Sequence, residues 1–192
     1  MTKGRLEAFS DGVLAIIITI MVLEIKVPHG DSEFKALIPL LPIFFSYLLS
    51  FIYLAIYWNN HHHLLHSAVK ISGGIMWANM HLLFWLSLLP FVTGWMGEND
   101  FAPNTLFLYG IVLLMSAAAY FILQNLIIKK NGKNSKLSDA IGKDIKGKIS
   151  LVLYLIAISV AFISPMISGI IYASVAIIWM IPDKRLERLF ED

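Results

Sequence analysis

The chain has 192 residues, of which 58% are hydrophobic and only 15% are charged, and its mean hydropathy is +0.73. A soluble domain carries about a quarter of charged residues, so this composition excludes an ordinary soluble protein and predicts an integral membrane protein. The absence of cysteine excludes disulfides, thiolate metal sites and cysteine nucleophiles. The net charge of +2 gives no reason to expect a nucleic-acid partner.

Apolar blocks long enough to cross about 30 Å of hydrocarbon as helices follow one another along the chain. They predict one domain, 1–192, with six spans at approximately 6–27, 37–58, 75–95, 101–128, 149–164 and 166–181. The last two spans come from one apolar stretch, which Pro165 and Gly169 divide because proline removes a helix donor and clashes with the preceding turn. The predicted fold class is all-α, a polytopic membrane protein with six transmembrane helices.

The basic residues between these spans are distributed unequally. The chain has 15 lysines and arginines, and if both termini are cytoplasmic, all of them except Lys26 and Lys35 lie on the cytoplasmic side. Because Lys and Arg accumulate in cytoplasmic loops, we predict this orientation. The basic segment 129–148 is then a solvated cytoplasmic loop.

The first predicted helix is unusual because it carries acidic residues. Only the segment 12–23 is uncharged between Asp11 and Glu24, and it is shorter than the roughly twenty residues that a lipid-facing span needs. We therefore expect this helix to lie inside a bundle. An ionisable side chain within a span is costly unless it faces protein or water, so Asp11 is a candidate functional residue.

The same helix has an apolar stripe. At 100° per residue, Ile16, Ile20 and Leu23 share one face and Thr19 lies at its margin, whereas Asp11 points away. Apolar stripes are common in membrane helices, so the periodicity alone leaves ordinary helix packing and a pore lining both open.

A cluster of histidines follows the second apolar block. His62 and His66 have the i, i+4 spacing that suits zinc, but no glutamate completes a His-Glu-x-x-His pattern. A metal site is the weaker alternative, and we expect these histidines to join a polar network or to face water. Their near-neutral titration would confer pH sensitivity.

Three motifs in the first half of the chain resemble one known family. The run Arg5–Ile16 (RLEAFSDGVLAI) is similar to the opening signature of the transmembrane protein 175 family, the lysosomal potassium channels and their bacterial relatives. The run at 58–62 (WNNHH) resembles the ending of the family's second helix, and Asn79 with 88–93 (LLPFVT) resembles its third. The last three helices resemble the family only in number, hydropathy and the basic loop.

The resemblance implies a cation channel in which four copies of a six-helix unit surround an axis lined by the first helix. Carried over to this sequence, Ile16 matches the family's hydrophobic constriction, and Ile20 and Leu23 match the next layers outward. Thr19 offers a hydroxyl between them. The single-unit form is typical of bacteria, so we expect a multi-pass protein of the plasma membrane that assembles as a homotetramer.

The expected mechanism follows from this hydrophobic gate. The sequence has no Thr-Val-Gly-Tyr-Gly filter, and a neck of four isoleucines gates by dewetting. Because potassium sheds its water more easily than sodium, we predict a leak-type channel with a modest preference for K⁺. Glu24 is either a residue of the external mouth that concentrates cations or a plain interfacial charge.

A buried polar network on the cytoplasmic side would hold the first helix at its angle to the axis. The residues we assign to this structural or gating network are Arg5, Phe9, Ser10, Asp11, Trp58, Asn60, His61, His62 and Asn79. The helical wheel places Arg5 and Phe9 on the same face as the apolar stripe, at its cytoplasmic end. This position for Arg5 disagrees with a place in a network that lies at the periphery of the pore.

Other classes of function are less favoured. A proton-conducting channel or a proton-coupled secondary transporter using Asp11 and the histidines is the alternative, but transporter folds usually show inverted repeats. The polar residues do not form the acid, base and nucleophile set of an enzyme, so we predict no enzymatic activity and no cofactor. The expected partners are permeant K⁺, the lipid bilayer and further copies of the chain.

Overall fold

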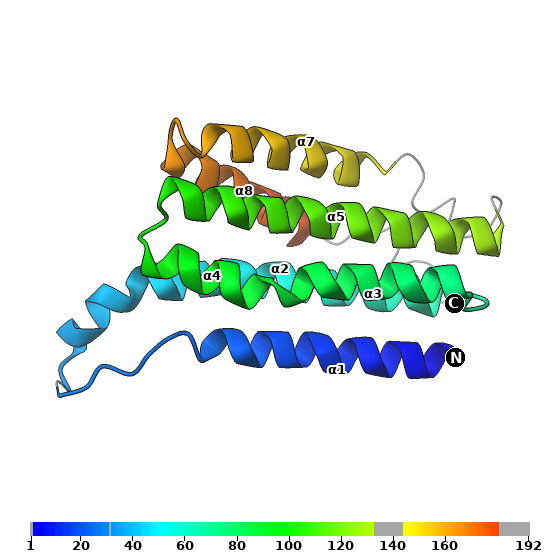
Figure 1. Ribbon diagram of the computed structural model, residues 1–192, viewed down its shortest axis with the longest axis horizontal. Helices are drawn as coiled ribbons and strands as arrows, with labels where there is room; N and C mark the ends of the chain where they lie inside the picture. Colours follow the sequence, from blue (N-terminus) through cyan, green and yellow to red (C-terminus); the bar gives the residue numbers. More distant parts are fainter. Residues whose placement is uncertain (1, 31, 133–143, 181–192) are drawn as a thin grey trace.

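The computed structural model describes residues 2–30, 32–132 and 144–180. These residues form six helical rods, one of them broken into two helices, and a 3-10 helix: α1 (Lys3–Val22), η1 (Phe34–Leu40), α2 (Leu41–His66), α3 (Gly73–Ser87), α4 (Leu89–Glu98), α5 (Pro103–Asn131), α7 (Ile145–Val160) and α8 (Pro165–Met180). The predicted all-α class and the six-helix membrane architecture are confirmed. In Figure 1 the rods run side by side along the long axis of the molecule.

Three of the helical segments are long and apolar enough to cross a membrane: Phe34–His66, Gly73–Glu98 and Pro103–Asn131. α8 is apolar but shorter, at 16 residues. α1 has 20 residues, enough for about 30 Å, but it carries Arg5, Glu7 and Asp11, which lower its hydropathy. A helix with this many charges needs protein or water beside part of its surface.

The helix ends differ from the limits that hydropathy suggested. α1 ends at Val22, so Glu24 and Val27 lie beyond it, and α2 continues to His66, well past the apolar block that ends at Trp58. Hydropathy locates the apolar part of a span, whereas a helix continues through polar residues such as Asn and His until its hydrogen bonds are interrupted. The Trp58–His62 motif therefore lies inside a helix.

The third rod is broken between α3 and α4. Pro90 is the second residue of α4 and has no backbone N–H to continue the pattern of α3. The amide of Leu88 donates to the carbonyl of Trp85 at 3.2 Å, which is a tighter 3-10 type of bond. The break turns α4 so that it packs against α2 and α1 as well as α5.

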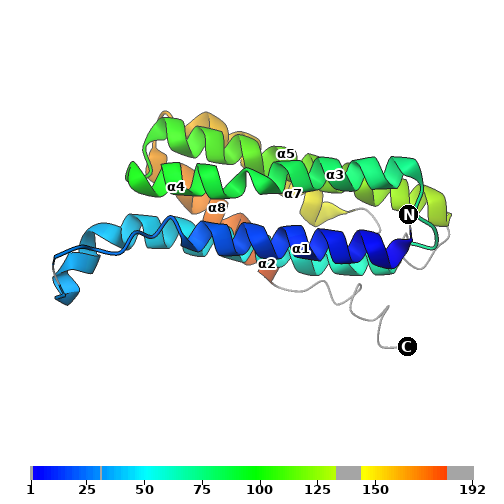
Figure 2. The same ribbon diagram turned by 60° about the horizontal axis from the view of Figure 1, so that its bottom comes forward.

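α1 lies at one edge of the bundle and α7 at the opposite edge (Figure 1). α1 contacts α2, α3 and α4, while α5 joins the two halves through contacts with α3, α4, α7 and α8. The long connection that contains η1 extends beyond the end of the bundle in both Figure 1 and Figure 2. Among the described residues, no helix covers the remaining face of α1.

The core between α2, α5 and α8 is held by tyrosine hydroxyls. Tyr53 donates to the carbonyl of Tyr172 at 2.7 Å, and Tyr172 donates to the carbonyl of Leu106 at 3.1 Å. Residue 110 must be glycine, because a Cβ there would lie 2.0 Å from the Tyr172 hydroxyl. These bonds tie the second half of the molecule to α2.

Candidate functional site

α1 has one buried face and one exposed face. The buried residues recur at helical spacing and pack on α2, α3 and α4: Leu6, Ser10, Leu14, Ile17 and Met21. On the other face Ile16 is 58% exposed and Leu23, just beyond the helix, is 67% exposed, and Ile20 is also exposed. A run of large apolar side chains left uncovered by the rest of the chain marks an interaction surface, with lipid, with another chain or around a pore.

Thr19 lies on the exposed face between the predicted constriction residues. Its hydroxyl donates to the carbonyl of Ile16 at 2.9 Å, so the hydroxyl proton is used within the helix. The lone pairs of Oγ1 remain on the exposed side, where they can accept a hydrogen bond from water or contact a cation.

The buried face carries a chain of hydrogen bonds through three helices. Nε2 of His61 on α2 lies 2.6 Å from Oδ1 of Asn79 on α3, and Nδ2 of Asn79 donates to Oγ of Ser10 on α1 at 2.9 Å. Because Oδ1 can only accept, Nε2 of His61 is the donor. Ser10 then donates to the carbonyl of Leu6 at 2.8 Å. All three polar side chains are fully buried or nearly so. Their hydrogen bonds fix α1 against α2 and α3.

Asp11 makes a separate contact at the surface. Nε1 of Trp58 donates to Oδ1 of Asp11 at 3.1 Å. The Trp58 ring stacks on the ring of His62, with 6.3 Å between the centroids, and the His62 ring stacks on that of His66 at 6.0 Å. Nζ of Lys3 donates to the carbonyl of His66. The start of α1 is thus joined to the end of α2 by exposed groups.

The remaining residues of the predicted network lie elsewhere. Arg5 and Phe9 are exposed, on the same face of α1 as Ile16, which is where the helical wheel placed them. Asn60 faces the other side of α2: its Nδ2 donates to the carbonyl of Ile56 at 2.8 Å, and its backbone carbonyl accepts from the hydroxyl of Tyr120 on α5 at 3.2 Å. The assigned set therefore divides into a buried chain, a surface contact and outlying residues.

Beyond the end of α1, Glu24 packs against α4. Its side chain lies 3.3 Å from the point where a Cβ on residue 94 would sit, so Gly94 makes room for it. Glu24 lines a groove of about 590 Å³ between α1 and α4, which continues along the exposed stripe; the groove is also lined by Ile16, Ile20, Phe91, Trp95 and Glu98. We did not predict from the sequence that α4 contributes to this groove. The feature that could have indicated it is Gly94, a glycine inside an apolar span between the aromatic residues Phe91 and Trp95.

The histidine cluster does not assemble a metal centre among the described residues, which hold no group of three or more His, Cys, Asp or Glu placed to bind a metal ion. His62 and His66 are stacked with an interplanar angle of 21°. Parallel rings present their faces to each other, whereas zinc ligands must point their nitrogens at one centre.

The geometry defines a class: an all-helical polytopic membrane protein whose first helix is pinned on one face and uncovered on the other. Residues 5–90 match the sequence model of the family described as endosomal/lysosomal potassium channel TMEM175. The chain is 57% identical over the full length of both chains to a potassium channel from Chryseobacterium sp. (strain P1-3). It is 32% identical over 181 residues to one from Chamaesiphon minutus, covering 86% of this chain and 87% of the relative.

A solved structure agrees with these sequence matches. The crystal structure of a lysosomal potassium-selective channel TMEM175 homolog from Chamaesiphon minutus superposes with a TM-score of 0.81 at 31% identity, covering 94% of this chain and 97% of that one. The chain belongs to the TMEM175 family, and the resemblance identified from its three motifs is confirmed.

Proposed function

We propose that the protein is a potassium-preferring cation channel in which the first helices of four copies line a central pore. The observation that carries the proposal is the exposed apolar stripe of α1, which begins at Ile16, on a helix whose opposite face is fixed by buried hydrogen bonds. The family and the names of the relatives, which are potassium channels, support the same function.

Lipid is a poor partner for this face of α1. Arg5 and Thr19 are exposed on it, and Glu24 lines the groove beside its outer end. In addition, only residues 12–23 are uncharged between Asp11 and Glu24, fewer than the roughly twenty that a lipid-facing span needs. A water-containing axis between copies of the chain accommodates both these polar groups and a short apolar neck.

The neck supplies both the gate and the preference for potassium. Four Ile16 side chains around an axis exclude water, so an ion passes only when the neck widens and the ion sheds part of its hydration shell. Potassium loses water more readily than sodium and crosses more often. Selectivity that rests on partial dehydration, without a cage of carbonyl ligands, is modest.

The buried chain of His61, Asn79 and Ser10 sets the position of the neck. Because it ties α1 to two other helices, a small rotation of α1 requires that at least one of these bonds break. In low dielectric a broken buried hydrogen bond is costly, which confines the helix to few arrangements. This series of hydrogen bonds is therefore the element that would separate the closed state of the channel from the open state.

The proposed orientation places both termini in the cytoplasm, in a plasma membrane. The first turn of α1, the last turn of α5 and the first turn of α7 lie at the same end of the bundle (Figure 1). Lys3, Arg5, Lys129 and Lys130 gather at that end, as the positive-inside rule requires. As a channel, the protein needs no enzymatic activity and no cofactor.

The test is the reversal potential of purified protein in planar bilayers with a K⁺/Na⁺ gradient, compared between wild type and Ile16→Asn. We expect a K⁺-directed reversal potential in the wild type and a potential near zero in the variant, whose amide carries water through the neck. Single-channel steps are expected for a pore. Flux that saturates or requires a proton gradient would favour the transporter alternative, which the potassium-channel names of the relatives do not support.

A further inference from the structure

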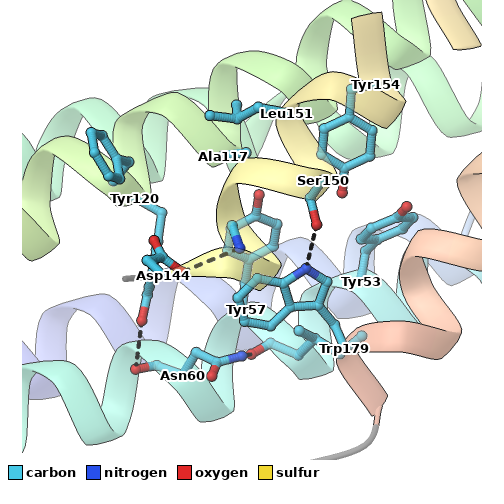
Figure 3. A pocket seen from close by; sticks show the side chains of 13 residues that line it. Tyr53, Tyr57, Asn60, Ala117, Tyr120, Asp144, Ser150, Leu151, Tyr154 and Trp179 are labelled. Atoms are coloured by element: carbon cyan, nitrogen blue, oxygen red, sulfur yellow. Dashed lines mark hydrogen bonds between the residues drawn. The ribbon is translucent and has the colours of Figure 1, made fainter. Parts of the chain in front are cut away.

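A second cavity lies on the side of α2 that faces away from α1. It has a volume of about 50 Å³ and is enclosed by α2, α5, α7 and α8. Figure 3 shows its aromatic walls, which are Tyr53, Tyr57, Tyr120, Tyr154 and Trp179. At about 10–15 Å³ for each water, it has room for a few water molecules or a small polar head group.

One carboxylate faces this aromatic cavity. Asp144 caps the start of α7: its Oδ1 accepts from the amide of Gly147 at 3.1 Å, and its Oδ2 accepts from Nε2 of Gln124 on α5 at 3.2 Å. Glycine at position 147 leaves room for this carboxylate, because a Cβ there would lie 2.6 Å from Oδ2 and would displace it. Among the residues that the structure describes, both donors to Asp144 are neutral, so they orient the carboxylate without cancelling its charge, and each oxygen keeps a lone pair for another donor.

The combination of rings and one carboxylate selects a ligand class. Aromatic faces attract cations through the ring quadrupole, and the attraction grows when the cation leaves water. An ammonium head also brings N–H donors, for which Asp144 and the side-chain oxygen of Asn60 are acceptors on the cavity wall. A neutral apolar ligand would contact the rings but would offer no donor to the half-buried Asp144 carboxylate.

We propose that this cavity binds a primary organic ammonium ion, with the ammonium group at Asp144 and the alkyl chain against the tyrosine and tryptophan rings. The site is independent of the α1 face, and its test does not require ion conduction. A short-chain amine fits the volume, and a longer chain leaves through the open side of the cavity.

The test is calorimetric titration of purified full-length protein with n-butylammonium, for wild type and Asp144→Asn. Asparagine is as good a helix cap as aspartate, and Gln124 can turn its amide to accept from the new Nδ2, so the variant removes only the charge. We expect the dissociation constant to rise about tenfold or more, as for loss of a charge-assisted bond. Glu33→Gln, which removes an exposed carboxylate elsewhere, is expected to leave it unchanged.

Two further measurements guard against a variant that fails to fold. Ala117 lines the cavity, and Ala117→Leu fills it without touching the charge, so it too should abolish most n-butylammonium binding. n-Butanol, of equal length but neutral, should not bind at the same concentrations. The proposal is wrong if wild type shows no binding, if n-butanol binds equally, if Ala117→Leu or Asp144→Asn binds like wild type, or if only Ile16→Asn weakens binding, which would place the amine on the α1 face.

Discussion

The two faces of α1 differ in what holds them. Ile17 is 4% exposed and packs in the core, whereas its neighbour Ile16 is 58% exposed and has no covering helix within the described chain. The buried face also contains Ser10, in a chain of satisfied hydrogen bonds, and the other face contains an apolar stripe. Large apolar side chains occur on both faces, so position relative to the bundle, and not hydrophobicity, decides whether a residue packs in the core or is left exposed.

The largest expected effect comes from substituting the two neighbouring isoleucines. Ile17→Asn buries an amide without a partner and should lower the free energy of unfolding by about 2–4 kcal/mol. Ile16→Asn should change it by less than about 0.5 kcal/mol, as is usual for exposed positions. Thermal unfolding of both variants in detergent measures this, and equal losses of stability would remove the distinction between the faces.

The next effect concerns the buried hydrogen-bond chain. Asn79→Leu leaves the Nε2 donor of His61 without an acceptor inside the core and should cost about 1–3 kcal/mol. The matched control is Asn125→Leu on α5, where the exposed amide donates to a carbonyl of its own helix, that of Phe121. Comparison of the two unfolding midpoints checks the prediction, which fails if the control is destabilised as much as Asn79→Leu.

The surface contact between α1 and α2 should matter less for stability. Trp58→Phe removes one hydrogen bond to a partly exposed carboxylate and should cost no more than about 1 kcal/mol. Asp11→Ala breaks the same contact and, in addition, is expected to reduce assembly or current. A double-mutant cycle tests whether the two substitutions share one interaction. Fully additive effects would show that the Trp58–Asp11 bond contributes nothing.

The smallest expected effect is at the outer end of the stripe. Glu24→Gln should lower the K⁺ conductance at low ionic strength, because a carboxylate beside the mouth raises the local cation concentration. The difference should disappear in high salt, where charges are screened within a few ångströms. Conductance measured against salt concentration decides between a mouth residue and a plain interfacial charge, for which the two proteins would conduct alike throughout.

The sequence predicted the helices well because apolar blocks are local features, and it predicted the two faces of α1 well because these follow from local periodicity. A residue such as Ile16 is placed on a face by its spacing alone, and the same wheel put Arg5 beside the stripe although the family motif had suggested the network. The roles of the stripe residues stay predictions. Hydropathy located the apolar blocks but not the end of α2 at His66, since polar residues continue the helix.

The sequence grouped residues of three helices into one network but did not show which of them contact one another. The motif residues Ser10 and Asp11 are neighbours, yet one joins Asn79 in the core and the other joins Trp58 at the surface. Which neighbour turns inward depends on the height and rotation at which two helices pack, and no local pattern fixes these. The cavity at Asp144 could not be predicted from the sequence for the same reason. Its walls come from four separate helices, and no local pattern brings them together.

The central claim is that the exposed face of α1 lines a central passage between copies of the chain, with its narrowest point at Ile16, and the absence of cysteine from the sequence permits a direct test. Ile16→Cys and Ile17→Cys are reconstituted in liposomes and treated with a membrane-impermeant, positively charged methanethiosulfonate, which reacts with thiolates in water. The account predicts that K⁺ flux through Ile16→Cys is blocked while Ile17→Cys and wild type are unaffected. Unchanged flux through Ile16→Cys, or equal block of Ile17→Cys, would contradict it.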